Sequence, residues 1–209
     1  MLFQNMRGEK MKVKLLDYTK DGIPLIARMA RSTRTNMLQP LHNSNNDEHF
    51  VKQLLKVQHL GILEHINFTF HVSEISRCLT HQLVRHRIAS YLQQSNRHAI
   101  PGRDDFVTPP SIKKTHLEFY VKEMHNAYDS YKALIDNDFA PIEDARYLIP
   151  DGYYTHIGIT MNCRELKHFF QLRCAKAAQW EIRNLAKEML EICYNKYPVI
   201  FEDEYKEFI

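Results

Sequence analysis

The pattern of hydrophobic and polar positions along the chain predicts a mixture of short strands and longer helices. Apolar residues at every second position predict strands at residues 12–18, 66–72 and 153–161. Apolar residues at helical spacing predict helices at residues 25–30, 48–58, 74–84, 117–137 and 141–146, and helix dominates after residue 161. Strands and helices do not alternate regularly, so a parallel sheet of βαβ units is not expected. The pattern predicts an α+β fold: a small, mostly antiparallel sheet flanked by several helices, including a long amphipathic one.

Turn and capping residues support several of these boundaries. Asn46 and Asp47 precede the helix at residues 48–58 and are suited to cap it. Residues 150–152, Pro-Asp-Gly, form a predicted turn. No internal repeat or low-complexity tract divides the sequence, so residues 1–209 are expected to form a single domain.

Composition narrows the class of protein. Hydrophobic residues make up 44% of the sequence and charged residues 25%, as in an ordinary soluble globule. The net charge of +3 is too small to indicate a nucleic-acid-binding protein by itself. No apolar stretch reaches the roughly 18 residues of a membrane span, and the N-terminus lacks the apolar run of a signal peptide. The four cysteines do not resemble a disulfide framework. A cytoplasmic protein with reduced thiols is expected, without membrane or nucleic-acid partners.

The densest group of hydrogen-bond donors lies at residues 85–97, with the sequence RHRIASYLQQSNR. Its three arginines offer planar donor groups that suit phosphate oxygens, and Ser90, Ser95 and Asn96 can add shorter donors from a loop. Few carboxylates compensate these donors, so the segment favours an anionic, phosphate-bearing ligand. Composition alone leaves open a solvated basic loop that binds nothing.

The spacing of these residues is more informative than their composition. The segment reads Arg-His-Arg, then Ser after two further residues, a second Ser after four more, and a final Arg after one more. This order resembles the signature of the flavin-dependent thymidylate synthase family. Other segments are similar to that family in the same order along the chain: His59 and residues 63–70, 81–84, 145–150, 162–173 and 178–182. The resemblance covers about residues 59–195, whereas residues 1–45 match poorly and carry no expected site.

The resemblance implies a methyltransferase that converts deoxyuridine monophosphate (dUMP) to thymidine monophosphate (dTMP) by reductive methylation at C5. Methylenetetrahydrofolate would donate the one-carbon unit, and FAD reduced by NADPH would donate the hydride. The cofactor then carries the redox chemistry, while the protein positions and polarises the substrates. The resemblance also implies a homotetramer in which subunits share active sites.

The same resemblance implies which residues meet each ligand. The expected dUMP contacts are Gln82, Leu83, Val84, Arg85, Gln93, Gln94, Ser95, Asn96, Arg97, Arg146 and Arg173. The expected FAD contacts are His59, Gly61, Arg85, His86, Arg87, Gln93, Asn162, Cys163, Arg164 and His168. Residues 85–97 are thereby divided into a start that meets the flavin and a loop that cradles the nucleotide phosphate.

Arg173 is the expected catalytic residue. On an ideal helix it falls within an apolar face, whereas Arg164 and His168 point to the opposite side. The other members of that face are Leu166, Phe169, Phe170 and Leu172. A charge there is costly unless it is paired, so Arg173 could extend to water or pair with a structural carboxylate. The resemblance implies instead that Arg173 lies against uracil and favours loss of the N3 proton, because a fixed cation stabilises the anion. No enzyme nucleophile would then be needed.

Other interpretations remain open from the sequence. A zinc site could use Cys78, His81, His86 and His98, although their spacing matches no common four-ligand pattern. A thiol mechanism would need one of four cysteines, three of which lie in expected helices, where free cysteine is usually buried. A nucleic-acid-binding module would use the Arg/His cluster and Tyr91. A related protein that binds both ligands without turnover is also possible.

Three positions depart from the family pattern. Gln93 stands where many members have Glu, so a contact there would be neutral. Gly61 stands where members often carry a hydroxyl side chain, which weakens the expected flavin contact. Ala177 replaces a histidine found in some members.

Overall fold

The computed structural model describes residues 11–33, 46–112 and 114–209. Its strands are β1 (Lys12–Tyr18), β2 (Asn67–Ser76), β3 (Ala89–Gln93) and β4 (Tyr154–Asn162). Its α-helices are α1 (Gly22–Ser32), α2 (Asp47–Lys56), α3 (Arg77–Leu83), α4 (Lys114–Asp136), α5 (Ile142–Ala145), α6 (Cys163–Arg173), α7 (Trp180–Lys196) and α8 (Pro198–Phe208). Two short 3-10 helices are η1 (Leu60–His65) and η2 (Arg146–Leu148). The predicted α+β class is confirmed.

The four strands form one sheet in the order β1-β2-β4-β3. Hydrogen bonds join the end of one strand to the start of its neighbour, which is the arrangement of antiparallel pairs. These bonds run from Thr19 N to Asn67 O, from Cys163 N to Ile66 O and from Gln94 N to His156 O. The period-two pattern is clearest in β2 and β4, which bury alternate residues over most of their length.

β2 is longer than predicted, and the helix expected from residue 74 begins only at Arg77. The alternation of buried residues in β2 is interrupted where Glu74 adopts a left-handed φ of 59°. A residue with a left-handed φ can insert one extra residue into a strand without ending the strand. Ile75 and Ser76 then follow as buried strand residues. The helix boundary was therefore wrong by three residues.

β3 was not predicted, because its residues lie inside the donor-rich segment. Ala89, Ser90 and Tyr91 are strand residues, so Ser90 does not donate from a loop as expected. The strand has a half-buried face that includes Tyr91 and Gln93. The donor-rich segment is thus a turn, a strand and a loop in succession.

The chain forms two compact units, each with its own packing. The first contains residues 72–83 and 92–157, and the second contains residues 13–71, 84–91 and 158–209. β2, β3 and β4 each pass from one unit into the other along the chain. The single-domain organisation of residues 1–209 stays a prediction.

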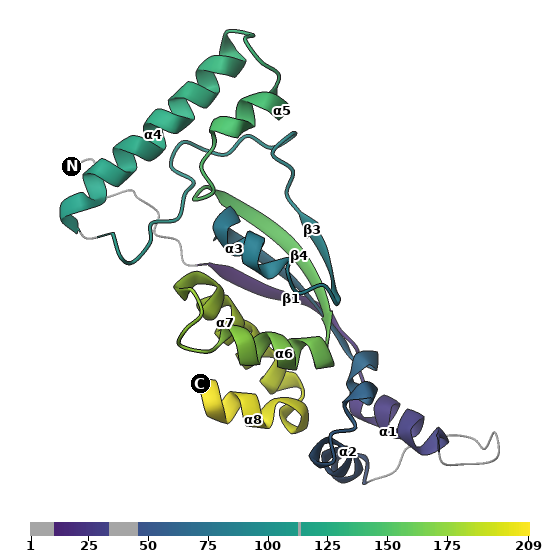
Figure 1. The fold of residues 1–209 in the computed structure, drawn as a ribbon. Helices are drawn as coiled ribbons and strands as arrows, with labels where there is room; N and C mark the ends of the chain where they lie inside the picture. The colour runs from purple at the N-terminus through teal and green to yellow at the C-terminus, as the bar shows by residue number, and fades with distance from the viewer. Residues whose placement is uncertain (1–10, 34–45, 113) are drawn as a thin grey trace. The chain divides into compact units, whose positions relative to one another are not determined.

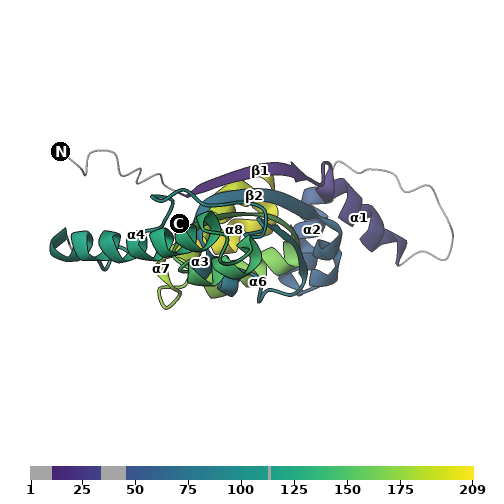
Figure 2. The same cartoon turned by 90° about the horizontal axis from the view of Figure 1, so that it is seen from above.

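In the second unit, α6, α7 and α8 pack against one another (Figure 1). Phe201 of α8 joins these helices to the sheet, because its ring meets Phe68 of β2 at 6.2 Å and Phe170 of α6 at 5.7 Å between centroids. All three rings are fully buried. α1 and α2 lie side by side in the same unit (Figure 2), where Arg31 and the buried Asp47 form an ion pair of 2.6 Å. This packing fixes α6, which carries several expected site residues.

In the first unit, the amphipathic helix α4 covers a small separate core. Phe106, Val121, Met124 and Tyr153 form this core. The Tyr153 hydroxyl donates to the backbone oxygen of Met124 at 3.0 Å, so the polar end of this buried ring is satisfied. The long helix predicted at residues 117–137 is confirmed, with its start three residues earlier.

Side-chain capping differs between the starts of α6 and α2. Asn162 Oδ1 accepts a hydrogen bond from Glu165 N at 2.9 Å, which fixes the start of α6. Asn46 stands at the N-cap of α2 but makes no side-chain capping bond, so its predicted cap was wrong. No helix in the described ranges is long and apolar enough to cross a membrane.

Candidate active site

The loop at the end of the donor-rich segment is ordered by Arg77, the first residue of α3. Arg77 Nη2 donates to Gln94 O at 2.9 Å and also to the side-chain oxygen of Asn96. Burial lowers the pKa of Arg77, although the nearby Asp151 carboxylate opposes this shift. The half-buried guanidinium therefore spans the loop and fixes the amide of Asn96.

Gln93 and Ser95 are also engaged within the first unit. Gln93 Nε2 donates to the hydroxyls of Thr80 at 3.1 Å and Thr155 at 3.3 Å. The Ser95 hydroxyl accepts a hydrogen bond from Arg97 N at 3.2 Å. The loop at residues 94–97 is thus a preorganised turn carrying the donors that the sequence assigned to a phosphate.

Two expected dUMP-binding arginines converge on Glu143 in the first unit. Arg97 Nη2 lies 2.5 Å from Glu143 Oε2, and Arg146 Nε donates to Glu143 O at 2.9 Å. Gln82 is half-buried at the end of α3, whereas the side chain of Leu83 is fully buried. Leu83 can therefore offer a ligand only its backbone.

The second unit contains the start of the donor-rich segment. Among residues 84–87, only His86 is buried. Val84, Arg85 and Arg87 are exposed in the turn after α3, whereas His86 is 4% exposed. The His86 ring packs edge-on against Phe169, with centroids 5.0 Å apart. Burial lowers its pKa, and the positive charge of Arg173 acts in the same direction.

Both ring nitrogens of His86 have partners on α6. Nδ1 lies 3.0 Å from Oε1 of the buried Glu165, and Nε2 lies 3.1 Å from Nε of Arg173. His86 therefore connects a carboxylate and a guanidinium of the same helix. The expected contact between His86 and FAD would have to use its backbone, since both nitrogens are engaged.

Arg173 is half-buried at the last residue of α6. The expected apolar face is only partly present: Leu166, Phe169 and Phe170 are fully buried, but Leu172 is 50% exposed, so its placement in that face was wrong. Arg164 and His168 are exposed on the opposite side, as predicted. The charge of Arg173 is thus held beside the buried face by the imidazole of His86.

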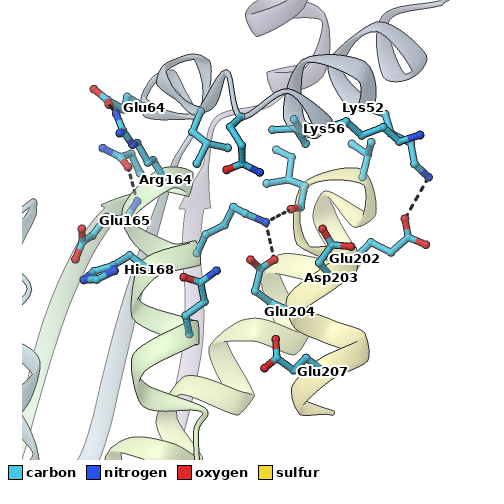
Figure 3. Close-up of a pocket in the computed structure, with 18 of the residues that line it drawn as sticks. Lys52, Lys56, Glu64, Arg164, Glu165, His168, Glu202, Asp203, Glu204 and Glu207 are labelled. Carbon is cyan, nitrogen blue, oxygen red and sulfur yellow. Dashed lines mark hydrogen bonds and ion pairs between the residues drawn. The ribbon is translucent and has the colours of Figure 1, made fainter.

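Several expected flavin contacts line a cavity of about 810 Å³ in the second unit (Figure 3). Arg164 and His168 lie at one end, and Arg164 Nη1 is 2.5 Å from Glu64 Oε1. Asn162 also lines this cavity. The labelled carboxylates of α8 lie at the other end. Cys163 is fully buried, so its side chain is not accessible to a ligand.

His59 and Gly61 line a second cavity of about 430 Å³ in the same unit. Both residues are exposed, and a Cβ added to Gly61 would meet nothing within 4 Å. The missing side chain at this position therefore leaves open space. The expected flavin contacts are divided between the two cavities.

The comparisons with known proteins decide the family. The model of the family described as "Thymidylate synthase complementing protein" matches residues 14–199. A relative from Geobacter sulfurreducens, named flavin-dependent thymidylate synthase, is 43% identical over 92% of this chain and 86% of its own. A relative of the same name from Saccharolobus solfataricus is 42% identical over 91% of this chain and 75% of its own. The chain belongs to the flavin-dependent thymidylate synthase family.

One solved structure shows a similar fold at lower identity. It is described as a UMP/dUMP methylase, PolB, from Streptomyces cacaoi, bound with 5-Br dUMP. It matches with a TM-score of 0.77 and 21% identity, over 95% of this chain and 96% of that chain. The family resemblance inferred from the motifs is therefore confirmed, and this likeness supports the fold.

Within this flavin-dependent thymidylate synthase fold, the cysteines are poorly placed for nucleophilic attack. Cys163, Cys174 and Cys193 are buried, and burial raises the pKa of all three thiols, that of Cys174 to about 12. Cys78 is exposed, although it lies in an expected helix, where free cysteine is usually buried. Within residues 11–33, 46–112 and 114–209, no group of three or more His, Cys, Asp or Glu could hold a metal ion.

The structure adds residues that the motif had not singled out. Arg77 and Glu143 organise the loop side in the first unit, and Glu165 organises His86 in the second. The sequence offered a signal for Glu165 alone: its position three residues after Asn162 matches a helix-start pattern. Arg77 and Glu143 are far from their partners in sequence, so only the fold reveals their contacts.

Proposed function

We propose that this enzyme converts dUMP to dTMP by reductive methylation at C5 in the cytoplasm, without an enzyme nucleophile. Methylenetetrahydrofolate supplies the one-carbon unit and NADPH the reducing equivalents. The position of Arg173 carries the proposal, because its guanidinium Nε is held at 3.1 Å by the buried imidazole of His86. Membership of the flavin-dependent thymidylate synthase family supports the reaction class.

In this proposal, donors of the first unit bind the phosphate of the nucleotide. Arg97, Ser95 and Asn96 receive the phosphate in a loop that Arg77 already holds. Gln82, Arg146 and the backbones of Leu83 and Val84 complete the nucleotide contacts, together with Arg85, Gln93 and Gln94. Because subunits of a homotetramer share sites, these groups can serve dUMP on different chains.

Arg173 acts on the base. A cation against the uracil carbonyl and N3 stabilises the N3 anion, which lowers the pKa of that group. The resulting electron-rich pyrimidine can attack the methylene carbon of the folate through C5 and later lose the C5 proton. The buried cysteines have no part in this sequence, because burial keeps their thiols protonated.

The residues of the second unit suit a flavin dinucleotide. Arg164, His168 and Asn162 offer donors along the 810 Å³ cavity, and His59 and Gly61 line the 430 Å³ cavity. A dinucleotide needs such donors for its two phosphates and open space for its rings. Arg85 and Arg87 are exposed and can add charge to the pyrophosphate site. FAD held there and reduced by NADPH would supply the hydride that completes the methyl group.

The decisive experiment combines a spectrum with a product assay. Purified protein should show flavin absorbance, lose it on addition of NADPH, and form dTMP when dUMP and methylenetetrahydrofolate are present. Protein that neither binds flavin nor forms dTMP would contradict the proposal. Salt-dependent oligonucleotide binding without mononucleotide binding would indicate the alternative nucleic-acid module.

A further inference from the structure

Glu165 is a buried carboxylate for which the proposed reaction has no direct use. It is 7% exposed and stands at the third position of α6, with its backbone N–H bound to Asn162. Its side chain turns away from the helix start and meets His86 Nδ1 at 3.0 Å. A buried carboxylate is costly unless a donor satisfies it, so this contact requires an explanation.

The contacts of His86 determine where its ring proton lies. Arg173 Nε is a donor under all ordinary conditions, because arginine stays protonated. His86 Nε2 must therefore present its lone pair to Arg173, and the ring proton must lie on Nδ1. Nδ1–H then donates to the Glu165 carboxylate. The three side chains form a chain of hydrogen bonds with one direction, Arg173 to His86 to Glu165.

Packing holds this chain rigid. His86 is flanked by Phe169 at 5.0 Å and by His168 at 5.9 Å between ring centroids. The Tyr91 hydroxyl donates to His86 O at 2.8 Å, which fixes the backbone of the same residue. Burial lowers the pKa of the imidazole, which favours the neutral form, the only form that can accept a hydrogen bond from Arg173.

From this geometry we infer that Glu165 and His86 are positioning residues that hold the Arg173 guanidinium in the orientation that ionises the uracil base. Glu165 fixes the tautomer of His86, and His86 in turn holds Nε of Arg173. With Nε held, the two terminal nitrogens of the Arg173 guanidinium keep one orientation. The inference rests on the function proposed above for Arg173. Neither residue needs to touch the substrate.

If Glu165 and His86 only position Arg173, replacing them should change the reaction rate more than the affinity for dUMP. The phosphate of dUMP is held by other residues, so loosening Arg173 should leave dUMP affinity nearly unchanged. Less of the uracil base should ionise at N3 and the reaction should slow, because displacing a catalytic group by about 1 Å costs roughly 100-fold in rate. Loss of the Glu165 carboxylate should therefore lower kcat about 10- to 100-fold with little change in KM for dUMP.

The test uses the FAD-loaded enzyme and three variants. Glu165→Leu removes the acceptor, and Glu165→Gln keeps an oxygen that can accept from His86 Nδ1. Asp47→Asn is the control, because Asp47 is also a buried carboxylate in an ion pair, with Arg31 at 2.6 Å, and lines neither cavity. Calorimetric titration with dUMP in buffers of different ionisation enthalpy measures protons released on binding and gives Kd. Steady-state assays give kcat and KM.

The expected result is a graded loss. Wild-type enzyme and Asp47→Asn should release the uracil proton equally, Glu165→Gln should release it partly, and Glu165→Leu should release least. The Kd of Glu165→Leu for dUMP should stay within about threefold of wild type. The fall in kcat should follow the same order. If Glu165→Leu fails to bind FAD or unfolds, Glu165→Gln alone decides, with partial release as the expected value.

Two outcomes would overturn different statements. Equal proton release by wild type and the folded Glu165 variants would overturn the positioning role. Binding of dUMP by wild type without any proton release, or a wild-type enzyme that makes no dTMP, would instead overturn the function proposed for Arg173. The two failures are therefore distinguishable in one series of measurements.

Discussion

Arg97 Nη2 lies 2.5 Å from Glu143 Oε2, so the last residue of the donor-rich motif is already paired with a carboxylate. Arg97 must exchange this partner for the phosphate when a nucleotide binds. Both side chains are about half-exposed, and such surface pairs contribute at most about 1 kcal/mol. Glu143→Gln should therefore tighten dUMP binding, by up to about fivefold.

The Glu143→Gln test needs a control that removes a similar surface carboxylate. Asp136→Asn breaks the exposed Lys132–Asp136 pair at 2.8 Å at the end of α4 and should leave the Kd for dUMP unchanged. Calorimetric titration of the two variants and wild type measures the effect. Weaker dUMP binding by Glu143→Gln would mean that Glu143 orients Arg97 for the phosphate.

Arg173→Ala should leave a folded protein that binds flavin but turns over little. Removing one charge-stabilising donor typically costs about 100- to 1000-fold in kcat, and the proposed ionisation of uracil depends on this side chain. Arg183→Ala is the control, because Arg183 is a cation on the adjacent α7 that donates to Lys176 O. Thymidylate formation and bound-flavin absorbance should be measured together; a wild-type rate in Arg173→Ala would refute the role.

Replacing all four cysteines should leave some activity. Three thiols are buried with raised pKa values, so they are poor nucleophiles, and only Cys78 is exposed. Intact-mass measurement after iodoacetamide treatment should show one modified residue in the native protein and four after denaturation. Complete loss of activity in a folded, flavin-loaded variant would restore the thiol mechanism.

Gly61→Ser should tighten FAD binding. A Cβ at this position meets nothing within 4 Å, so the side chain fits without displacing a neighbour. Its hydroxyl adds a donor toward FAD, and such a hydrogen bond is worth about 1 kcal/mol, or about a fivefold lower Kd for FAD. Gly61→Ala is the control for the backbone, because it adds the Cβ without the hydroxyl. Equal affinity of the serine and alanine variants would contradict the contact.

Acid should destabilise the fold in part through His86. Burial lowers its folded-state pKa below the usual value of about 6.5, although Glu165 partly opposes the shift. Between the lowered pKa and about 6.5, the unfolded chain binds more protons than the folded chain, so the free energy of unfolding falls as pH decreases through this window. Above pH 6.5 this contribution is fully present. The charged or titratable groups that face His86 are Glu165, His168, Arg173 and Tyr91.

Urea unfolding between pH 5 and pH 8 measures this effect. His86→Gln removes the titrating group and should show a shallower loss of stability toward pH 5 than wild type. His116→Gln is the control, because His116 is exposed at the start of α4. Identical pH slopes for wild type and His86→Gln would show that His86 does not titrate on unfolding.

The sequence predicted the fold where hydrophobic spacing was regular. β1, β4 and α4 were found within a few residues, because each has one buried face along its length. β3 was missed since its residues also belong to a charged binding motif, which hides the alternation of a strand. The boundary between β2 and α3 was missed since a single left-handed residue leaves no mark in a hydrophobic pattern.

The site was predicted unevenly for a similar reason. Family spacing identified Arg173 and His86, and the structure brings these two side chains together within the second unit. Spacing gave no indication of Glu143 or Arg77, because their partners are 46 and 17 to 19 residues away. Long-range contacts of this kind depend on the packed fold, and the roles of the remaining expected residues stay predictions.

The left-handed Glu74 also determines how much the length of β2 can vary. Its carboxylate is held by Lys12 Nζ at 2.5 Å, and the residue that it inserts brings Ser76 to a buried position, where its hydroxyl accepts from Leu79 N at 3.1 Å. A single deletion upstream would turn Ser76 toward the other face of the sheet and move the first turn of α3. Relatives that gain or lose residues in this strand should therefore do so two at a time, the repeat of the pleat.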